Sequence, residues 1–200
     1  FNNRFLEVVS PKHEGTTAGR LLDKRGGDSG YMVIVQVDDH AKQRAHVERK
    51  GAKIVWEVDH PEAATFHLHP RELGAILSFD VARPPESWLW AGPWEDKVHT
   101  EVIEDFAGVE LQSDDPKAMA EKWAELVQQP VVEKSPTRYE IELGGDVLRF
   151  VRDSDGRGPG VSGIDVKVND KARILRTAKE RGLECGEDWV MIGGTRFRLV

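Results

Sequence analysis

The chain has 200 residues, of which 39% are hydrophobic and 32% are charged, and its formal net charge at neutral pH is −7. This balance is typical of a folded globular protein and excludes a disordered chain. Acidic and basic residues are interspersed, so no basic face is predicted for nucleic acid or an anionic membrane, and no apolar run approaches the roughly 20 residues of a membrane span. Cys185 is the only cysteine, which excludes a disulfide framework and predicts a reducing compartment, the cytoplasm.

A repeated pattern organises the chain. Residues 35–41 align without a gap with residues 166–172, an offset of 131, and Gly51 keeps that offset at Gly182. Each copy predicts a short strand, an Asn or Asp pair that caps a helix, about eleven helical residues and a glycine stop. The same cap, length and stop together favour a duplicated unit.

The alignment extends in both directions if the loops change length. Residues 74–79 align with residues 194–199, and residues 5–9 align with residues 147–151. Both changes of offset fall in stretches rich in Gly, Ser, Asp and Pro, where insertions are tolerated. The second alignment predicts a strand over residues 5–9.

The second copy begins earlier in the repeat than the first. A strand is predicted over residues 106–112, and a helix follows that is capped by Asp115, opened by Pro116 and stopped before Pro130. The equivalent part of the first copy would precede Phe1. We therefore expect the first copy to start partway through its own repeat and the natural chain to be longer.

The pattern predicts an α+β fold of tandem strand–helix–three-strand modules that form two domains. The first domain covers residues 1–82, with its N-terminal module incomplete, and the second covers residues 99–200. Residues 83–98 are interpreted as a linker because of their prolines. The linker also carries three tryptophans, which predict packing across a domain face or stacking on an aromatic ligand: Trp88, Trp90 and Trp94.

The module pattern resembles the vicinal oxygen chelate superfamily, which includes glyoxalase I, methylmalonyl-CoA epimerase, extradiol dioxygenases and bleomycin-resistance proteins. The resemblance is carried by residues 30–39 (GYMVIVQVDD), 52–57 and 66–80, which are similar to a bacterial glyoxalase-like branch. It implies curved mixed sheets around a cavity. It also implies a divalent metal held by one residue from the first strand and one from the last strand of each module.

Those ligand positions are poorly filled here. In the first domain the readable positions fall on Glu7, Met32 and Ser78. Met is a soft, neutral ligand and Ser is a poor one at neutral pH, so neither suits a hard catalytic cation. In the second domain the positions fall on Gly108, Arg149, Gly163 and Arg198. We therefore predict no metal and no other cofactor.

Each polar candidate has a structural alternative. Glu7 is either a general base whose pKa is raised by burial or an acid at a pocket wall paired with Arg or Lys. His67 and His69 lie two residues apart, so both imidazoles can face one ligand, or His69 can simply hydrogen-bond the turn that Pro70 begins.

The two arginines at ligand positions, Arg149 and Arg198, are treated in the same way. They can clamp a carboxylate or phosphate, but a salt bridge that fills a degenerate cavity is the favoured interpretation. The expected acidic partners are Glu140, Glu142 or Glu110. Two Gly-rich stretches, residues 25–30 and 155–160, lack phosphate-loop spacing and are interpreted as connectors.

The sequence thus predicts a protein that binds a small oxygenated metabolite in the first domain. The catalytic candidates are Glu7 and His67, and the ligand-binding candidates are Met32, Gln36, His69, Ser78, Trp88 and Trp90. One interpretation is a lyase, isomerase or hydrolase, and the alternative is a non-catalytic binding or sequestering protein of the bleomycin-resistance type. The expected partner is a small-molecule ligand rather than nucleic acid or a membrane, and a homodimer is left open.

Overall fold

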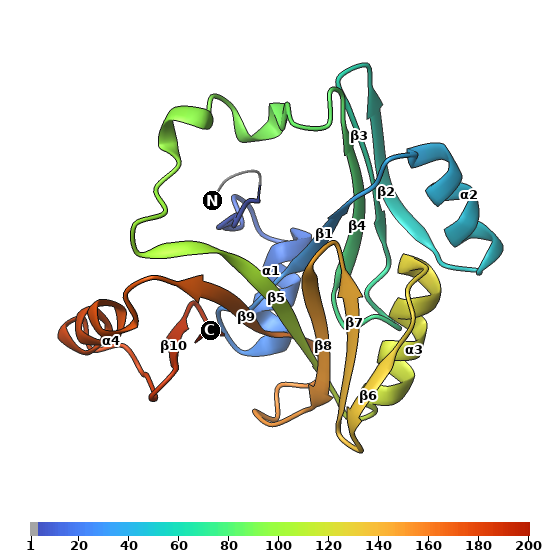
Figure 1. Ribbon diagram of the computed structural model, residues 1–200. Helices are drawn as coiled ribbons and strands as arrows, with labels where there is room; N and C mark the ends of the chain where they lie inside the picture. Colours follow the sequence, from blue (N-terminus) through green and yellow to red (C-terminus); the bar gives the residue numbers. More distant parts are fainter. Residues whose placement is uncertain (1–3) are drawn as a thin grey trace.

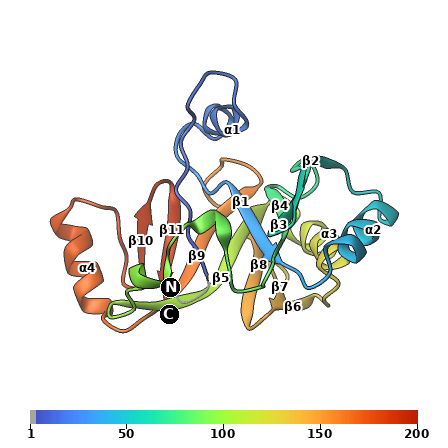
Figure 2. The same ribbon diagram turned by 90° about the horizontal axis from the view of Figure 1, so that it is seen from above.

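The computed structural model describes residues 4–200 and confirms the predicted α+β class. Within these residues, eleven strands form two mixed sheets, and the chain also has four α-helices (Figure 1). Figure 2 shows the two sheets side by side, with α2 near one end of the molecule and α4 at the other. No helix in this part of the chain is both long enough and apolar enough to cross a lipid bilayer.

The first sheet has four strands in the order β1-β4-β3-β2. Its elements are β1 (Met32–Gln36), α2 (His40–Arg49), β2 (Ile54–His60), β3 (Ala63–Leu68) and β4 (Ile76–Ala82). The first strand, β1, pairs in parallel with the last strand, β4, and the remaining pairs are antiparallel. Two short 3-10 turns, Leu89–Ala91 and Glu95–Lys97, lie in the segment that leads to the second sheet.

The second sheet has seven strands in the order β10-β11-β9-β5-β8-β7-β6. Its first half consists of β5 (Ile103–Ser113), α3 (Pro116–Val127), β6 (Val132–Ser135), β7 (Arg138–Leu143) and β8 (Asp146–Arg152). Its second half consists of β9 (Gly160–Val168), α4 (Lys171–Glu180), β10 (Trp189–Ile192) and β11 (Thr195–Leu199). The halves join where β5 and β9 pair in an antiparallel ladder.

One parallel strand pairing recurs three times along the chain, and the third instance has one strand fewer than the other two. In each instance the first strand pairs in parallel with the last: β1 with β4, β5 with β8, and β9 with β11. The register also agrees with the sequence alignment, because Met32 opposes Ile76 as Gly163 opposes Arg196. One difference separates the sheets: β9 also pairs with β5, whereas among the described residues β1 pairs with β4 alone.

The predicted helix caps are confirmed. The side chain of Asp39 accepts a hydrogen bond from the backbone at the start of α2, and Asp115 and Asp170 do the same for α3 and α4. Each such bond satisfies a backbone N–H that has no partner inside the helix. After α2 and α4 the chain turns at Gly51 (φ 72°) and Gly182 (φ 67°), a backbone conformation that glycine adopts most easily.

The strand predicted over residues 5–9 is wrong, because this segment has no regular structure. Its counterpart, β8, is held by parallel pairing with the first strand of its own module. Every first strand within residues 4–200 already pairs with a last strand of its own, so no such partner remains for residues 5–9. The start of the segment is held by ion pairs instead, from Arg4 to Asp105 (2.6 Å) and Asp146 (3.0 Å).

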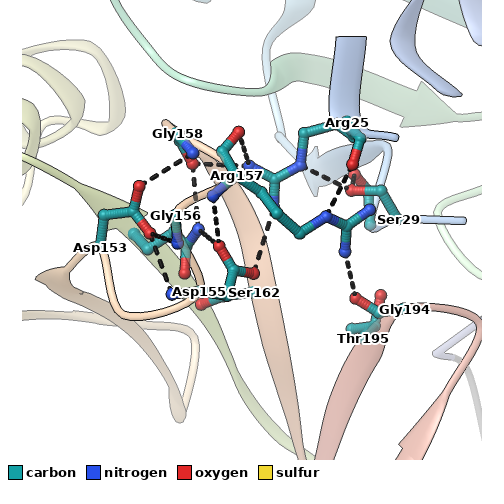
Figure 3. A network of polar contacts seen from close by, with 12 residues as sticks. Arg25, Ser29, Asp153, Asp155, Gly156, Arg157, Gly158, Ser162, Gly194 and Thr195 are labelled. Carbon is teal, nitrogen blue, oxygen red and sulfur yellow. Dashed lines mark hydrogen bonds and ion pairs between the residues drawn. The ribbon is translucent and has the colours of Figure 1, made fainter. Parts of the chain in front are cut away.

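A helix that the sequence analysis did not predict, α1 (Thr17–Arg25), follows this segment. Two arginines tie its C-terminal end to the loop between β8 and β9 (Figure 3). The buried Arg25 donates from Nη1 to the carbonyl oxygens of Arg157 (2.9 Å) and Gly158 (2.6 Å). In return, Arg157 donates from Nε to the Arg25 carbonyl (2.8 Å) and from Nη2 to that of Asp28 (2.6 Å). The Gly-rich loops at both ends of this network serve as acceptors of arginine hydrogen bonds.

Gly194→Ala tests how tightly the turn between β10 and β11 packs against the backbone of Asp28. Gly194 has a φ of 63°, and a Cβ placed on it would lie 1.8 Å from the carbonyl oxygen of Asp28. A left-handed alanine usually costs about 1 kcal/mol in unfolding free energy. At this position the cost should be larger, because the backbone of residue 28 must also move. The matched control is Gly193→Ala, where φ is 54° but a Cβ would meet nothing within 4 Å. Urea denaturation should show a clearly larger loss of unfolding free energy for Gly194→Ala, and equal losses would contradict the close packing.

Candidate functional site

Polar side chains gather on one face of the first sheet. Because side chains alternate along a strand, the apolar residues of β3 and β4 enter the core while their neighbours point to the other side. In one row across the strands, Trp56, His67, Ser78 and Ile34 are register partners. In the next row, the register partners are Val58, Thr65, Asp80 and Gln36. We call these two rows the polar face.

A buried carboxyl group lies at the centre of the polar face. Asp80 is 6% exposed, and its Oδ1 accepts hydrogen bonds from Thr65 Oγ1 (2.7 Å) and from Ser78 Oγ. The two hydroxyl oxygens also lie 2.9 Å from each other. Both hydroxyls thus donate to the same carboxyl oxygen, and they hold the Asp80 side chain in place.

The surroundings shift the protonation of Asp80 and His67 in opposite directions. Burial raises the pKa of Asp80, and the hydrogen bonds from Ser78 and Thr65 only partly offset this effect. Burial lowers the pKa of His67, against a smaller opposing effect of the Asp80 charge. The His67 ring packs on Trp56 at a centroid distance of 4.6 Å. The face therefore favours neutral forms of both groups.

Four of the residues predicted to form the site share this side of the first sheet. His67 and Ser78 stand next to each other in the register, and Gln36 opposes Asp80. Met32 precedes Ile34 by two residues on β1, so it extends the same side of the strand. The side chain of Gln36 donates to the Pro85 carbonyl (2.8 Å), which ties the following segment to the edge of the sheet.

The remaining predicted residues lie elsewhere. Glu7 is exposed on the irregular N-terminal segment, without the burial that its proposed role as a base requires. His69 accepts a hydrogen bond at Nδ1 from the backbone N–H of Arg71 (3.0 Å), which is the turn contact that the sequence left open. Trp88 packs on Phe5 at 5.0 Å, as does Trp94 at 5.3 Å, and Trp90 is 47% exposed.

Sequence reasoning missed Asp80 and Thr65. A signal for both was present in the alternation of β3 and β4. Ser78 and Asp80 interrupt a run that is otherwise apolar, as Thr65 and His67 do on the neighbouring strand. Polar residues with a period of two on a strand whose other side is apolar indicate a second, chemically distinct face.

The corresponding face of the second sheet is filled by a salt-bridge network. Arg149 on β8 is 3% exposed and holds Asp165 through two hydrogen bonds, from Nη1 (2.6 Å) and Nη2 (2.8 Å). Its Nε donates to Glu110 (2.9 Å), and Arg198 lies 3.3 Å from Asp165. The favoured interpretation of the two arginines therefore agrees with the structure, with Glu110 as one partner and Asp165 as one that was not anticipated.

The charges in this network are mutually satisfied. Burial lowers the pKa of Arg149, but the hydrogen bonds and charges of Asp165 and Glu110 outweigh that effect and raise it above the ordinary value. Ser162 Oγ adds a hydrogen bond to Glu110 (3.0 Å). The cluster leaves no unpaired cation to attract an anion.

The residues at the metal positions that the family resemblance implies do not fit a divalent cation. The second sheet offers glycines and arginines there, and arginine repels a cation. The first sheet offers a thioether and a hydroxyl, and that hydroxyl is already donated to Asp80. Within residues 4–200, no three His, Cys, Asp or Glu side chains are grouped so that they could hold a metal ion.

The fold matches those of several solved structures. A hypothetical protein from Staphylococcus aureus aligns with a TM-score of 0.65 and 10% identity, over 92% of this chain and 70% of that chain. A variant of 4-hydroxymandelate synthase from Streptomyces coelicolor aligns with a TM-score of 0.61 and 14% identity, over 92% and 60% of the two chains. The Mn(II)-bound glyoxalase from Novosphingobium aromaticivorans aligns with a TM-score of 0.60 and 13% identity, over 84% and 61%.

These similarities define the fold. The chain has the fold of a glyoxalase and of a 4-hydroxymandelate synthase variant, in agreement with the glyoxalase-like fold that the resemblance predicted. It spans about three fifths of the length of the synthase and the glyoxalase. No family model matches the sequence, and neither does any curated protein. At these identities the similarity is one of fold alone.

Arg149→Met tests whether the second sheet depends on its buried cation. The substitution leaves Glu110 and Asp165 buried without Arg149, so we expect a loss of about 3–5 kcal/mol in unfolding free energy. The control is Arg138→Met. Arg138 is half-exposed where it pairs with Glu140, so the expected loss is at most about 1 kcal/mol. Equal losses by chemical denaturation would show that the buried network is not needed for stability.

Asp80→Asn tests the burial of the carboxyl group. Because the pKa of Asp80 is raised on folding, the folded state keeps its proton where the unfolded chain has lost it. Its contribution to stability is thus present below the ordinary aspartate pKa and is lost as the pH rises through the folded value. The unfolding free energy of Asp80→Asn should therefore rise relative to that of the wild type as the pH increases above the ordinary aspartate pKa of about 4. Curves of unfolding free energy against pH that stay parallel for Asp80→Asn and the wild type would refute the expectation.

Proposed function

We propose that the polar face binds a small oxygenated metabolite, such as a hydroxyketone or a hydroxy acid. One observation carries the proposal: a buried carboxyl group with a raised pKa shares a face with a half-buried imidazole with a lowered pKa. Pairs of groups whose protonation is shifted by their surroundings are found preferentially at functional sites. The remainder of this site consists of neutral donors and acceptors, which suit an oxygen-rich neutral or weakly charged ligand.

Different side chains of the polar face would contact different parts of the ligand. A neutral His67 offers one donor and one acceptor, and Gln36 at the edge offers an exposed amide. The indole of Trp56, 50% exposed and packed on His67, provides an apolar wall for the carbon skeleton. The hydroxyls of Thr65 and Ser78 hold the Asp80 carboxyl group in place beneath the face.

The reaction that this arrangement suits is proton transfer next to a carbonyl group. A neutral imidazole can accept a proton from carbon, and a protonated carboxyl group can supply one. Such steps are common to isomerases and lyases. In this interpretation His67 is the base, and Asp80 is the acid that exchanges its proton through Ser78 or Thr65.

Non-catalytic binding is the second candidate. It is favoured by the 6% exposure of Asp80, which keeps this carboxyl group under two hydroxyls and away from a ligand above them. It is also favoured by Met32 and Ser78 at positions where the fold offers metal ligands. Binding without turnover would then rest on His67, Gln36 and Trp56.

Nuclear magnetic resonance tests the binding site. Hydroxyacetone, glycolaldehyde and lactate should shift the resonances of the His67 ring and the Trp56 indole. His67→Gln should weaken binding by about tenfold, the effect of losing one good hydrogen bond. The control is His99→Gln, which removes an exposed imidazole from the segment between the sheets and should leave binding unchanged. Equal affinities of the two variants would rule out the polar face as the site.

Exchange of carbon-bound hydrogen with deuterated water separates catalysis from binding. A catalytic face should exchange the hydrogens next to the carbonyl of hydroxyacetone, and Asp80→Asn should slow this exchange more than it weakens binding. Shifted His67 resonances without any exchange would assign the face to binding alone.

A further inference from the structure

A pocket of about 210 Å³ lies away from the polar face, where the first sheet meets helix α3. Its walls come from the turn after α2, the end of β3, the turn between β3 and β4, and α3 itself. Figures 1 and 2 both place α2 and α3 next to each other on this side of the molecule. At roughly 30 Å³ for each water, the volume equals about seven waters, enough for a small organic group. We call it the interface pocket.

The floor of the interface pocket is apolar and firmly held. It is lined by Leu68 of β3, Leu73 of the turn between β3 and β4, and Leu126 of α3, and all three residues are at most 3% exposed. The turn that carries Leu73 is fixed because the buried indole of Trp123 donates to the Leu73 carbonyl (3.0 Å). This floor is therefore preformed, and the three almost fully covered side chains close the pocket from below.

The rim of the interface pocket carries an excess of positive charge. Lys53, Arg71 and Lys122 line it together with a single carboxylate, Glu72. Lys122 lies 3.8 Å from Glu72, but no ion pair among residues 4–200 engages Lys53 or Arg71. Two unpaired cations at one hollow contrast with the net charge of −7 of the chain as a whole. Both side chains are exposed, so each can turn towards a ligand at the mouth.

We propose that the interface pocket binds a small organic anion, a carboxylate or a phosphate monoester joined to a short apolar group. The apolar group rests on the three leucines, and the anion is held by Arg71 and Lys53. The planar guanidinium of Arg71 can hold either anion through two hydrogen bonds, while Lys53 adds a point charge. Because the pocket exists only where the first sheet contacts α3, the bound anion also stabilises that contact.

The probes for this site are phenyl phosphate, benzoate and the uncharged benzyl alcohol, which share one ring and differ in the head group. Phenyl phosphate or benzoate should shift the methyl resonances of Leu68 and Leu126 in the full chain. Benzyl alcohol should bind at least about tenfold more weakly, since it lacks the charge-assisted hydrogen bonds. The stronger of the two anions identifies the head group, and His67→Gln should leave both affinities unchanged, which separates this site from the polar face.

A double variant identifies the residues that hold the anion. Lys53→Gln with Arg71→Gln should weaken phenyl phosphate or benzoate binding by at least about tenfold. The matched control, Arg176→Gln with Lys179→Gln, removes the same charge from exposed positions on α4 and should bind as the wild type does. The proposal is overturned if no anion shifts the leucine resonances, if benzyl alcohol binds as tightly as the anions, or if the two double variants bind alike.

Discussion

The contact between α3 and the first sheet is the constraint on which the rest of the molecule depends. Trp123 packs on Phe150 of its own sheet, with ring centroids 5.8 Å apart, and donates to the backbone of the first sheet at Leu73. From the other side, Gln43 of α2 donates to the Leu126 carbonyl near the end of α3 (2.8 Å). One helix thus belongs to the cores of both sheets. Its position fixes the orientation of the polar face and creates the interface pocket.

The two sheets use one topology for different chemistry. In the second sheet a buried arginine forms ion pairs with two carboxylates, so each of these three charges has a partner. In the first sheet a carboxyl group is held by hydroxyls alone, without a cation in hydrogen-bond contact. An acid in such surroundings is easier to keep protonated, and a neighbouring imidazole is easier to keep neutral. The carboxyl group with the raised pKa therefore belongs to the first sheet, while the second contributes an ion-pair network and the shared helix.

Local patterns in the sequence were sufficient for much of the fold. The cap at Asp115 and the stop before Pro130 bound α3, and the alignment of residues 35–41 with 166–172 matched two instances of the same strand–helix unit. Such features depend on residues close together in the chain, where backbone hydrogen bonding decides the outcome. The strand expected over residues 5–9 failed because a strand needs a partner edge, which its own sequence does not supply. The helix α1 was missed because its glycine-rich end resembled a connector.

The site was harder to predict than the fold. Ser78 was selected because it falls on a position that the family uses, and His67 because it lies two residues from His69 on a predicted strand. Asp80 lies two residues beyond the Ser78 position and was missed. The partner of Arg149 was only half anticipated, because Asp165 is joined to it through the register of three strands. Glu7 was selected for its aligned position, but the structure leaves that residue exposed. Burial, which sets the protonation of each candidate, depends on contacts between distant segments that no local pattern reveals.

The central claim is that the polar face shifts the protonation of its two key groups. Carbon-13 titration of the Asp80 carboxyl group and the His67 ring in the full chain measures this directly. The pKa of Asp80 should lie above the ordinary aspartate value of about 4, and the pKa of His67 should lie below the ordinary histidine value of about 6.5. Ordinary titration of both groups would mean that the face is hydrated like the rest of the surface, and would contradict the account.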